Sequence, residues 1–293
     1  MKKNILFIIN PISGYKPSVK EKIESLIDNI LDKDKFTYKI QNTKRKDHAI
    51  EISRNAVKEG FDIIIVVGGD GSINEVVQSI INTDVILGII PLGSGNGLAH
   101  HLKIPLKPEN AIEVINQFKI KKIDTASCND KVFVSIAGIG FDARVAKKFA
   151  KTRKRGFLSY LKIIIKEYPF YKPRDYEINI DGKQIQRNAF IINFANSDQF
   201  GYDTTIAPNA KIDDGLIDVC IVKKVPLVEL PISAHLLYWK QIDKSRFIEI
   251  IKAKNITIKR KKKSTVNIDG EPVKLAKELE IKINPLSLNV IVP

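Results

Sequence analysis

Uniformly apolar runs alternate with amphipathic segments through the first 125 residues. A short, wholly apolar run of β-branched residues is typical of a strand buried on both faces, and apolar residues three or four positions apart are typical of a helix. The expected strands cover 4–9, 36–40, 63–67 and 85–90 and a segment close to 123, and the expected helices cover 18–31, 47–58, 72 onward and 109–117. This alternation predicts a Rossmann-like, parallel α/β domain with right-handed crossovers.

After about residue 126 the pattern changes to short strands with hairpin turns. The dipeptides Asp181-Gly182 and Asp269-Gly270 are typical of two-residue turns between antiparallel strands. The expected strands cover 131–136, 176–180, 189–194, 216–222, 255–259, 265–268, 279–283 and 288–292, and the expected helices cover 142–148, 157–166 and 228–240. We therefore predict a mainly antiparallel second domain that begins near residue 126.

The most informative stretch, residues 63–77, reads I-I-I-V-V-G-G-D-G-S-I-N-E-V-V. Its buried strand is interrupted by Gly68, Gly69 and Gly71, which permit backbone angles and close approaches that a Cβ atom would forbid. Ser72 and Glu75 have the spacing of a capping box, so we expect a helix to begin at Ser72. A strand, a glycine-rich turn and a helix N-terminus together predict an anion cradle suited to a phosphate.

Asp70 lies inside this predicted cradle. A carboxylate at a phosphate site is reasonable if it contacts Mg²⁺ or accepts a proton from an attacking hydroxyl. The alternative is that Asp70 is an ordinary turn residue between a strand and a helix. The sequence alone leaves both readings open.

Two further loops follow predicted buried strands, N-P-I-S-G at 10–14 and P-L-G-S-G-N-G at 91–97. In parallel sheets, ligands bind beyond the carboxyl ends of the strands, where both loops fall. The first is most simply a turn, and the second is favoured as another anion-binding nest. The polar or glycine positions of interest in the two loops are Asn10, Ser13, Gly14, Gly93, Ser94, Gly95 and Asn96. A third candidate, N-I-D-G-E-P at 267–272, is most simply a hairpin with a solvated Glu271.

The formal net charge of +15 indicates an anionic partner or surface. Charge alone does not distinguish nucleic acid, anionic lipid and nucleotide. Two basic runs stand out, at 147–155 and 259–263. The only cysteines, Cys128 and Cys220, lie far apart with no metal-ligand spacing, which favours a reducing compartment. The N-terminal apolar run is too short for a signal peptide, and no run approaches transmembrane length.

The loops taken together resemble the diacylglycerol kinase catalytic-domain family of lipid kinases, which includes soluble bacterial lipid kinases and sphingosine kinases. The resemblance rests on G-G-D-G-S-I-N-E-V-V, P-L-G-S-G-N-G-L-A and N-P-x-S-G, and on G-I-G-F-D-A from 138, A-P-N-A-K-I-D-D-G-L-I-D from 207 and D-G-E at 269, all in family order. It implies an ATP-binding α/β domain over 1–125, a β-sandwich lipid-binding domain over 126–285, and a last strand at 286–293 that rejoins the first domain. The implied ligands are ATP·Mg²⁺ and a lipid, bound in a cleft between the domains.

The resemblance also implies roles for individual residues. The nucleotide would contact residues of three loops and one helix: Asn10, Ser13 and Gly14; Gly68, Gly69, Gly71 and Ser72; Gly93, Ser94, Gly95 and Asn96; and Glu75. Asp70 would be an essential carboxylate and Glu271 the general base. Asp124 and Asp214 match acids linked to metal binding, with the backbone carbonyls of Lys211 and Leu216 at a structural Mg²⁺.

Gly97 departs from the pattern of diacylglycerol-type members, which usually have Asp after the Asn. The small residue is closer to the sphingosine-kinase version, so diacylglycerol-like and sphingoid lipids both remain open as acceptors. The implied reaction is γ-phosphoryl transfer from ATP to a lipid hydroxyl in phospholipid metabolism, by a cytoplasmic enzyme held peripherally on anionic membranes by the two basic runs. The alternatives are phosphorylation of a soluble dinucleotide, as in NAD kinases, and a basic, non-catalytic nucleotide-binding protein. We expect no nucleic-acid partner, and a homodimer is left open.

Overall fold

The computed structural model describes residues 2–11, 22–152, 156–201 and 204–293. The chain divides into two compact units. The first contains residues 1–123 and 286–293, and the second contains residues 124–285. The first four residues of the helix expected at 18–31 fall outside the described residues.

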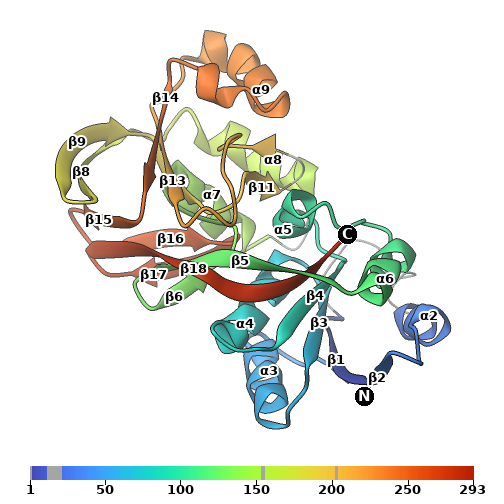
Figure 1. Ribbon diagram of the computed structural model, residues 1–293. Coiled ribbons are helices and arrows are strands. Elements are labelled where there is room, and N and C mark those ends of the chain that lie inside the picture. Colours follow the sequence, from blue (N-terminus) through green and yellow to red (C-terminus); the bar gives the residue numbers. More distant parts are fainter. Residues whose placement is uncertain (1, 12–21, 153–155, 202–203) are drawn as a thin grey trace. The chain divides into compact units, whose positions relative to one another are not determined.

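The first unit is a parallel sheet covered by helices. Its strand order is β2-β1-β3-β4, with the end of β18 beside β4, and every printed pair of neighbours is parallel. The strands are β1 (Lys3–Ile9), β2 (Phe36–Asn42), β3 (Ile63–Gly68) and β4 (Ile86–Pro91), and the helices are α2 (Ile23–Ile30), α3 (His48–Lys58), α4 (Asp70–Ile80), α5 (Gly97–His101) and α6 (Pro108–Gln117). Helices α3 and α4 pack together, as do α2 and α6, and Figure 1 shows the two pairs on opposite sides of the sheet. Because both faces are covered, β3 and β4 are buried at every position.

The described part of the second unit contains two large antiparallel sheets and a short two-stranded one, β11-β12. One large sheet has the order β14-β13-β10-β7-β16-β17, and the other includes β18-β15-β8-β9, with β5 beside β18 and β6 beside β5 (Figure 1). The strands are β5 (Lys119–Cys128), β6 (Lys131–Phe133), β7 (Ile136–Gly140), β8 (Arg174–Ile180), β9 (Lys183–Ala189), β10 (Ile191–Ala195), β11 (Gln199–Gly201), β12 (Thr204–Thr205), β13 (Ile217–Val222), β14 (Ile248–Ala253), β15 (Asn255–Lys259), β16 (Ser264–Ile268), β17 (Glu271–Leu275) and β18 (Glu278–Val292). The helices are α7 (Phe141–Phe149), α8 (Phe157–Glu167) and α9 (Leu230–Tyr238), with 3₁₀ turns η1 (Leu227–Glu229) and η2 (Ile242–Lys244).

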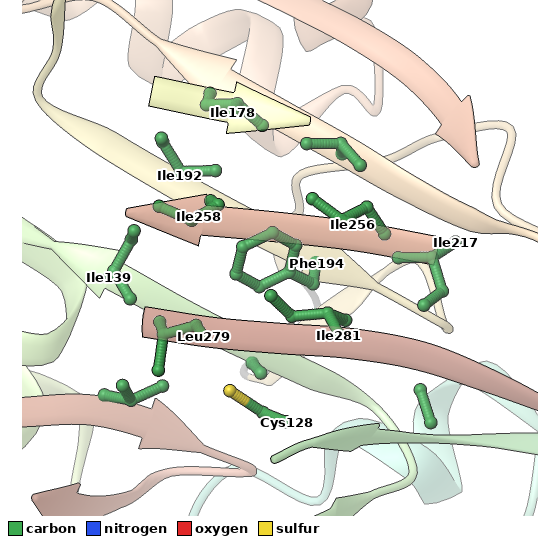
Figure 2. Close-up of a cluster of buried hydrophobic side chains, with 14 of the residues drawn as sticks. Cys128, Ile139, Ile178, Ile192, Phe194, Ile217, Ile256, Ile258, Leu279 and Ile281 are labelled. Carbon is green, nitrogen blue, oxygen red and sulfur yellow. The ribbon is translucent and has the colours of Figure 1, made fainter. Parts of the chain in front are cut away.

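One apolar cluster joins these two sheets. Figure 2 shows Phe194 of β10 among isoleucines of β15, and the fully buried Ile258 and Ile281 come from the sheet opposite to Phe194. Alternate apolar positions of each strand therefore face a shared core, as in a sandwich. The predicted fold class, a parallel α/β domain followed by an antiparallel β domain, is confirmed.

Both predicted hairpin turns are confirmed. Asp181 and Gly182 connect β8 to β9 with positive φ angles of 47° and 92°. Asp269 and Gly270 connect β16 to β17 with φ angles of 45° and 89°. These angles are the left-handed pair that two-residue hairpins require.

Several predicted boundaries were wrong, and each has a local cause. The strand expected at 131–136 is broken into β6 and β7, because the Asp269 carboxylate accepts the backbone N–H groups of Val134, Ser135 and Ile136 at 2.8, 2.9 and 3.0 Å. The strand expected at 189–194 is likewise divided between β9 and β10, whereas 279–283 and 288–292 form one continuous strand, β18. The helix expected from 228 to 240 is a 3₁₀ turn followed by α9. Helix α5 and strand β14 were missed.

Candidate functional site

Three loops of the first unit follow the neighbouring strands β1, β3 and β4 and are bound to one another. The backbone N–H of Asn10 donates to Val67 O at 3.1 Å, and that of Leu92 donates to Gly68 O at 2.8 Å. The Asn10 side chain donates from Nδ2 to the Ser72 hydroxyl at 2.9 Å. The structure therefore brings Asn10, Gly68–Ser72 and the loop after β4 to one edge of the sheet, as the sequence predicted from its strand ends.

The two glycine-rich loops touch through their backbones at Gly69 and Gly93. A Cβ atom on Gly93 would lie 2.5 Å from Gly69 Cα and 2.6 Å from Asn96 Oδ1, and one on Gly69 would lie 2.8 Å from Gly93 Cα. Both positions therefore require glycine. Asn96 fixes its own loop, because its Oδ1 accepts the Gly93 N–H at 2.9 Å and its Nδ2 donates to Gly93 O at 3.0 Å.

Asp70 connects the first glycine loop to the second. Its Oδ1 accepts the backbone N–H of Leu98, at the start of α5, at 3.4 Å. Burial raises the pKa of the Asp70 carboxyl, while backbone N–H groups of Gly97 and Leu98 oppose the shift. Asp70 is therefore more than a turn residue, because it contacts the N-terminus of the helix that follows P-L-G-S-G-N.

Helix α4 begins at Asp70, with Gly69 as its N-cap, so the predicted start at Ser72 is wrong by two residues. The reason is that the predicted capping box does not form. Ser72 accepts from Asn10, and the Glu75 carboxylate accepts the N–H groups of Asp47 and Ala49 at 3.1 Å each, at the start of α3. The first turn of α4, whose N–H groups have no partner within the helix, is thus left beside the loop glycines.

The remaining nucleotide-site predictions have simpler outcomes. Gly71, Ser94 and Gly95 are partly exposed at the same sheet edge, so a ligand can reach them. Ser13 and Gly14 lie outside the described residues. A nucleotide role for Glu75 stays a prediction, because its carboxylate binds the α3 N-terminus in this structure.

In the second unit, the two acids of D-G-E have different environments. Asp269 is 9% exposed and accepts the three N–H groups that separate β6 from β7, so it is a structural residue. Glu271 is the first residue of β17, is partly exposed, and pairs in register with Ile268 of β16. Of these two, only Glu271 is partly exposed to solvent.

Asp142 is a buried carboxylate to which the sequence analysis gave no role. It is the second residue of α7 and is 4% exposed. Asn193 Nδ2 donates to it at 3.1 Å, and Asn267 Nδ2 donates at 2.9 and 3.1 Å. A Cβ atom on Gly138 would lie 1.9 Å from Asp142 Oδ2, so this network requires the glycine. Burial raises the pKa of Asp142 from 3.8 to about 6, although both asparagines oppose the shift.

Asp142→Asn is expected to make the protein more stable above pH 6 and to flatten its stability between pH 4 and 7. The folded pKa is the higher one, so the protonated acid favours folding and this contribution disappears as the pH rises from 3.8 to about 6. The difference between the unfolded pKa of 3.8 and the folded pKa of about 6 corresponds to about 3 kcal/mol of folding free energy. The new amide can pair because Asn193 Oδ1 and Asn267 Oδ1 accept no hydrogen bond from the described residues.

Urea unfolding at several pH values measures this effect, with the exposed Asp130→Asn as control. A stability difference between Asp142→Asn and the parent protein that does not change with pH would contradict the assignment of Asp142 as the titrating group.

The residues predicted to bind a structural metal are brought together, and one of them, Asp214, has a basic partner. Gly215 N–H donates to Asp124 Oδ2 at 2.7 Å, and Leu216 N–H donates to Asp214 Oδ1 at 3.1 Å. Lys252 Nζ lies 2.9 Å from Asp214 Oδ2 and 3.3 Å from Asp218 Oδ2. Carboxylate oxygens are suitable ligands for Mg²⁺, and in this structure Asp214 and Asp218 share the Lys252 ammonium. No group of three or more acidic, histidine or cysteine side chains in the described part of the chain is arranged to hold a metal ion. Lys211 is exposed, and its predicted role is untested.

Lys252→Met is expected to make stability depend on Mg²⁺. Removing the ammonium leaves the buried Asp218 and the partly exposed Asp214 facing each other, at a cost of about 2 kcal/mol. Millimolar Mg²⁺ should restore part of the lost melting temperature, whereas the parent protein and Lys254→Met, an exposed neighbour, should respond to neither Mg²⁺ nor chelator. Destabilisation of the parent protein by chelator would show that a metal binds there despite Lys252.

Comparison with known proteins covers both units. The model of the diacylglycerol kinase catalytic domain matches residues 4–128, and that of the YegS C-terminal NAD kinase beta sandwich-like domain matches residues 135–292. The chain is 30% identical over 277 residues to a diacylglycerol kinase of Staphylococcus aureus (strain Newman), covering 92% of this chain and 87% of the relative. It is 28% identical over 280 residues to a diacylglycerol kinase of Staphylococcus saprophyticus, with coverages of 92% and 90%. The crystal structure of a diacylglycerol kinase from Bacillus anthracis str. Sterne has the same fold, with a TM-score of 0.77, 22% identity and coverages of 99% and 97%.

Proposed function

Because the chain belongs to the diacylglycerol kinase family of lipid kinases, we propose that it transfers the γ-phosphoryl group of ATP to the hydroxyl of a diacylglycerol-like lipid. The observation that supports this best is the backbone contact of Gly69 with Gly93, together with the Asp70 link to α5. These contacts hold two loops rich in N–H groups at one sheet edge. Such an edge is suited to bind a triphosphate.

The first unit supplies the nucleotide-binding residues in this proposal. Backbone N–H groups of Gly69–Ser72 and of the loop at Ser94 and Gly95 donate to the phosphates, Gly93 and Asn96 hold that loop in place, and Asn10 orients Ser72. They stabilise negative charge that develops on the transferred phosphoryl group. The Mg²⁺ that accompanies ATP neutralises charge on the β- and γ-phosphates when bound, and Asp70 is the acidic group of these loops that would contact it.

The second unit supplies the acceptor side. Glu271 accepts the proton of the lipid hydroxyl as that oxygen attacks the γ-phosphorus, and ADP leaves. Asp70 is the alternative base. We favour Glu271 because Asp70 already accepts N–H groups at α5, while Glu271 is partly exposed at the start of a strand.

A lipid acceptor requires contact with a membrane surface, and we propose that the protein is cytoplasmic and binds this surface peripherally. No helix in the described parts of the chain is long and apolar enough to cross a membrane. Helix α9 and the turn before it present large apolar side chains to solvent, with Val228 84%, Ile232 64% and Trp239 60% exposed. Apolar side chains exposed to this extent, on a protein of net charge +15, are suited to insertion at an anionic interface.

Trp239 is the only tryptophan of the chain, so its fluorescence reports this contact directly. Vesicles containing an anionic lipid are expected to shift its emission to shorter wavelength as the indole leaves water. Val228→Asp with Ile232→Asp should weaken partitioning at least tenfold, because each buried apolar side chain contributes about 1.5–3 kcal/mol. Leu106→Asp, at an exposed position of the first unit, is the control. If vesicles leave the emission spectrum of Trp239 unchanged, α9 does not contact the membrane.

The acceptor is tested by incubating the protein with labelled ATP and separate acceptors: monoacylglycerol, diacylglycerol, sphingosine, ceramide and NAD. We expect the highest kcat/KM for diacylglycerol. Preferential labelling of sphingosine would show that the acceptor is a sphingoid lipid, the class that Gly97 suggests. Labelling of NAD alone would favour the alternative function, which has some support in the NAD kinase-like description of the second domain.

A further inference from the structure

The second unit contains a cavity of about 500 Å³ with a strongly basic lining. It is formed by the end of β7 with the start of α7, by residues 171 and 173–176, and by residues 260–262 and 264–265. Six cationic side chains line it: Arg144, Lys147, Arg174, Arg260, Lys261 and Lys262. Asp175 is the only carboxylate among the described lining residues.

Few of these charges are neutralised by the protein itself. Arg144 pairs with Glu167 at 2.7 Å, and it is the only one of the six in an ion pair with a described carboxylate. One oxygen of Asp175 accepts from Asn188 at 2.6 Å. The Arg174 guanidinium lies over the Tyr171 ring, 5.4 Å from its centroid. The lining therefore repels cations and attracts anions.

Arg260 carries the strongest argument because it is charged and only 6% exposed. It donates from Nη1 to the Ser264 hydroxyl at 2.9 Å, and from Nη2 to the carbonyl oxygens of Leu275 and Ala276. Its Nε has no acceptor among the described residues. Burial also lowers the pKa of this guanidinium. A buried charge without a counter-ion is costly, and an anion in the cavity would supply that counter-ion.

We propose that this cavity binds a phosphate group. Guanidinium groups match phosphate oxygens with paired donors, and the cavity offers three arginines, three lysines and the Ser264 and Thr265 side chains. The phosphate comes either from a phospholipid headgroup or from a small soluble phosphate ester. Phe170 is 82% exposed beside the lining residue Tyr171, which favours the headgroup. The site involves the second unit alone and does not depend on the kinase reaction.

The basic run 259–263 provides matched variants. Lys261 and Lys262 line the cavity, whereas Lys259 and Lys263, which are also exposed, do not. The double variants K261Q/K262Q and K259Q/K263Q therefore remove the same charge from the same run. All four positions are on the surface, so both variants should fold, and melting curves will check this. R174Q is a further test on a different segment.

Binding is measured without nucleotide at 150 mM salt. One arm titrates glycerol 3-phosphate by calorimetry, and the other uses phosphatidylcholine vesicles containing either phosphatidylglycerol or an equal charge of oleate. We expect K261Q/K262Q and R174Q to weaken phosphate-dependent binding at least tenfold, and K259Q/K263Q to weaken it less than threefold. If the protein binds phosphatidylglycerol vesicles but not glycerol 3-phosphate, the ligand is a phospholipid headgroup. If it also binds glycerol 3-phosphate, a soluble phosphate ester is sufficient as the ligand.

Equal losses of binding in the two double variants, or equal binding to oleate and phosphatidylglycerol vesicles, would show that general surface charge, and not the cavity, is responsible for the binding. Absence of binding in both arms would overturn the proposal. Neither result bears on lipid phosphorylation, which is measured separately.

Discussion

Glu271→Gln is expected to lower the rate of lipid phosphorylation by about 10²–10⁴-fold while ATP·Mg²⁺ affinity barely changes. The substitution keeps the size of the side chain but removes the group that accepts the lipid hydroxyl proton. The hairpin that presents it should persist, because Asp269, not Glu271, accepts the backbone N–H groups between β6 and β7. Initial rates and calorimetric nucleotide binding measure the two parts of the prediction.

Glu278→Gln, at an exposed position of β18, is the control and should retain the parent rate. Loss of nucleotide binding in Glu271→Gln would place this residue on the nucleotide side. A rate close to that of the parent would transfer the base role to Asp70.

Asp70→Asn is expected to abolish turnover and to weaken ATP·Mg²⁺ binding as well. The amide removes the negative charge that would contact the nucleotide-bound Mg²⁺, but its oxygen can still accept the Leu98 N–H. We therefore expect a loss of unfolding free energy of no more than about 1 kcal/mol. Thermal melting, calorimetry and initial rates test these expectations on the same preparation. Activity within tenfold of the parent would show that Asp70 only connects the two loops.

The features predictable from sequence were those encoded by local patterns. The uninterrupted apolar runs of β3 and β4 predicted strands buried on both faces, and the Asp-Gly pairs at 181 and 269 predicted tight hairpins. The glycine-rich loops predicted turns with exposed backbone N–H groups at the sheet edge. Gly69 and Gly93 must be glycine because a Cβ atom on either would collide with the backbone of the other.

The features that escaped prediction depend on partners distant in sequence. Glu75 had the spacing to cap its own helix, but its carboxylate binds N–H groups of α3, 26 and 28 residues earlier. Nothing in the sequence predicts the ion pair between Lys252 and Asp214, because it depends on the pairing of β13 with β14. Helix α5 has only five residues, which is too short to show a helical repeat.

The same limit applies to the buried and basic sites. Asp142 reads as an ordinary acid near a helix start, and only the fold places it between Asn193 and Asn267. The basic run at 259–263 was expected to act as a whole in holding the protein on anionic membranes, yet its middle residues line a cavity and its outer two do not. A run of charged residues in the sequence shows how many charges are present, but only the fold shows which of them face the same cavity.

The position of the label after reaction with ATP tests the central claim most directly. Diacylglycerol in anionic vesicles is incubated with ATP labelled at either the γ- or the α-phosphorus, and the lipid is then extracted. We predict γ-label in a lipid phosphate monoester, no α-label in the lipid, and neither in Asp70→Asn. Extracted lipid without γ-label, from protein that is folded and binds ATP, would contradict the assignment as a diacylglycerol-type kinase.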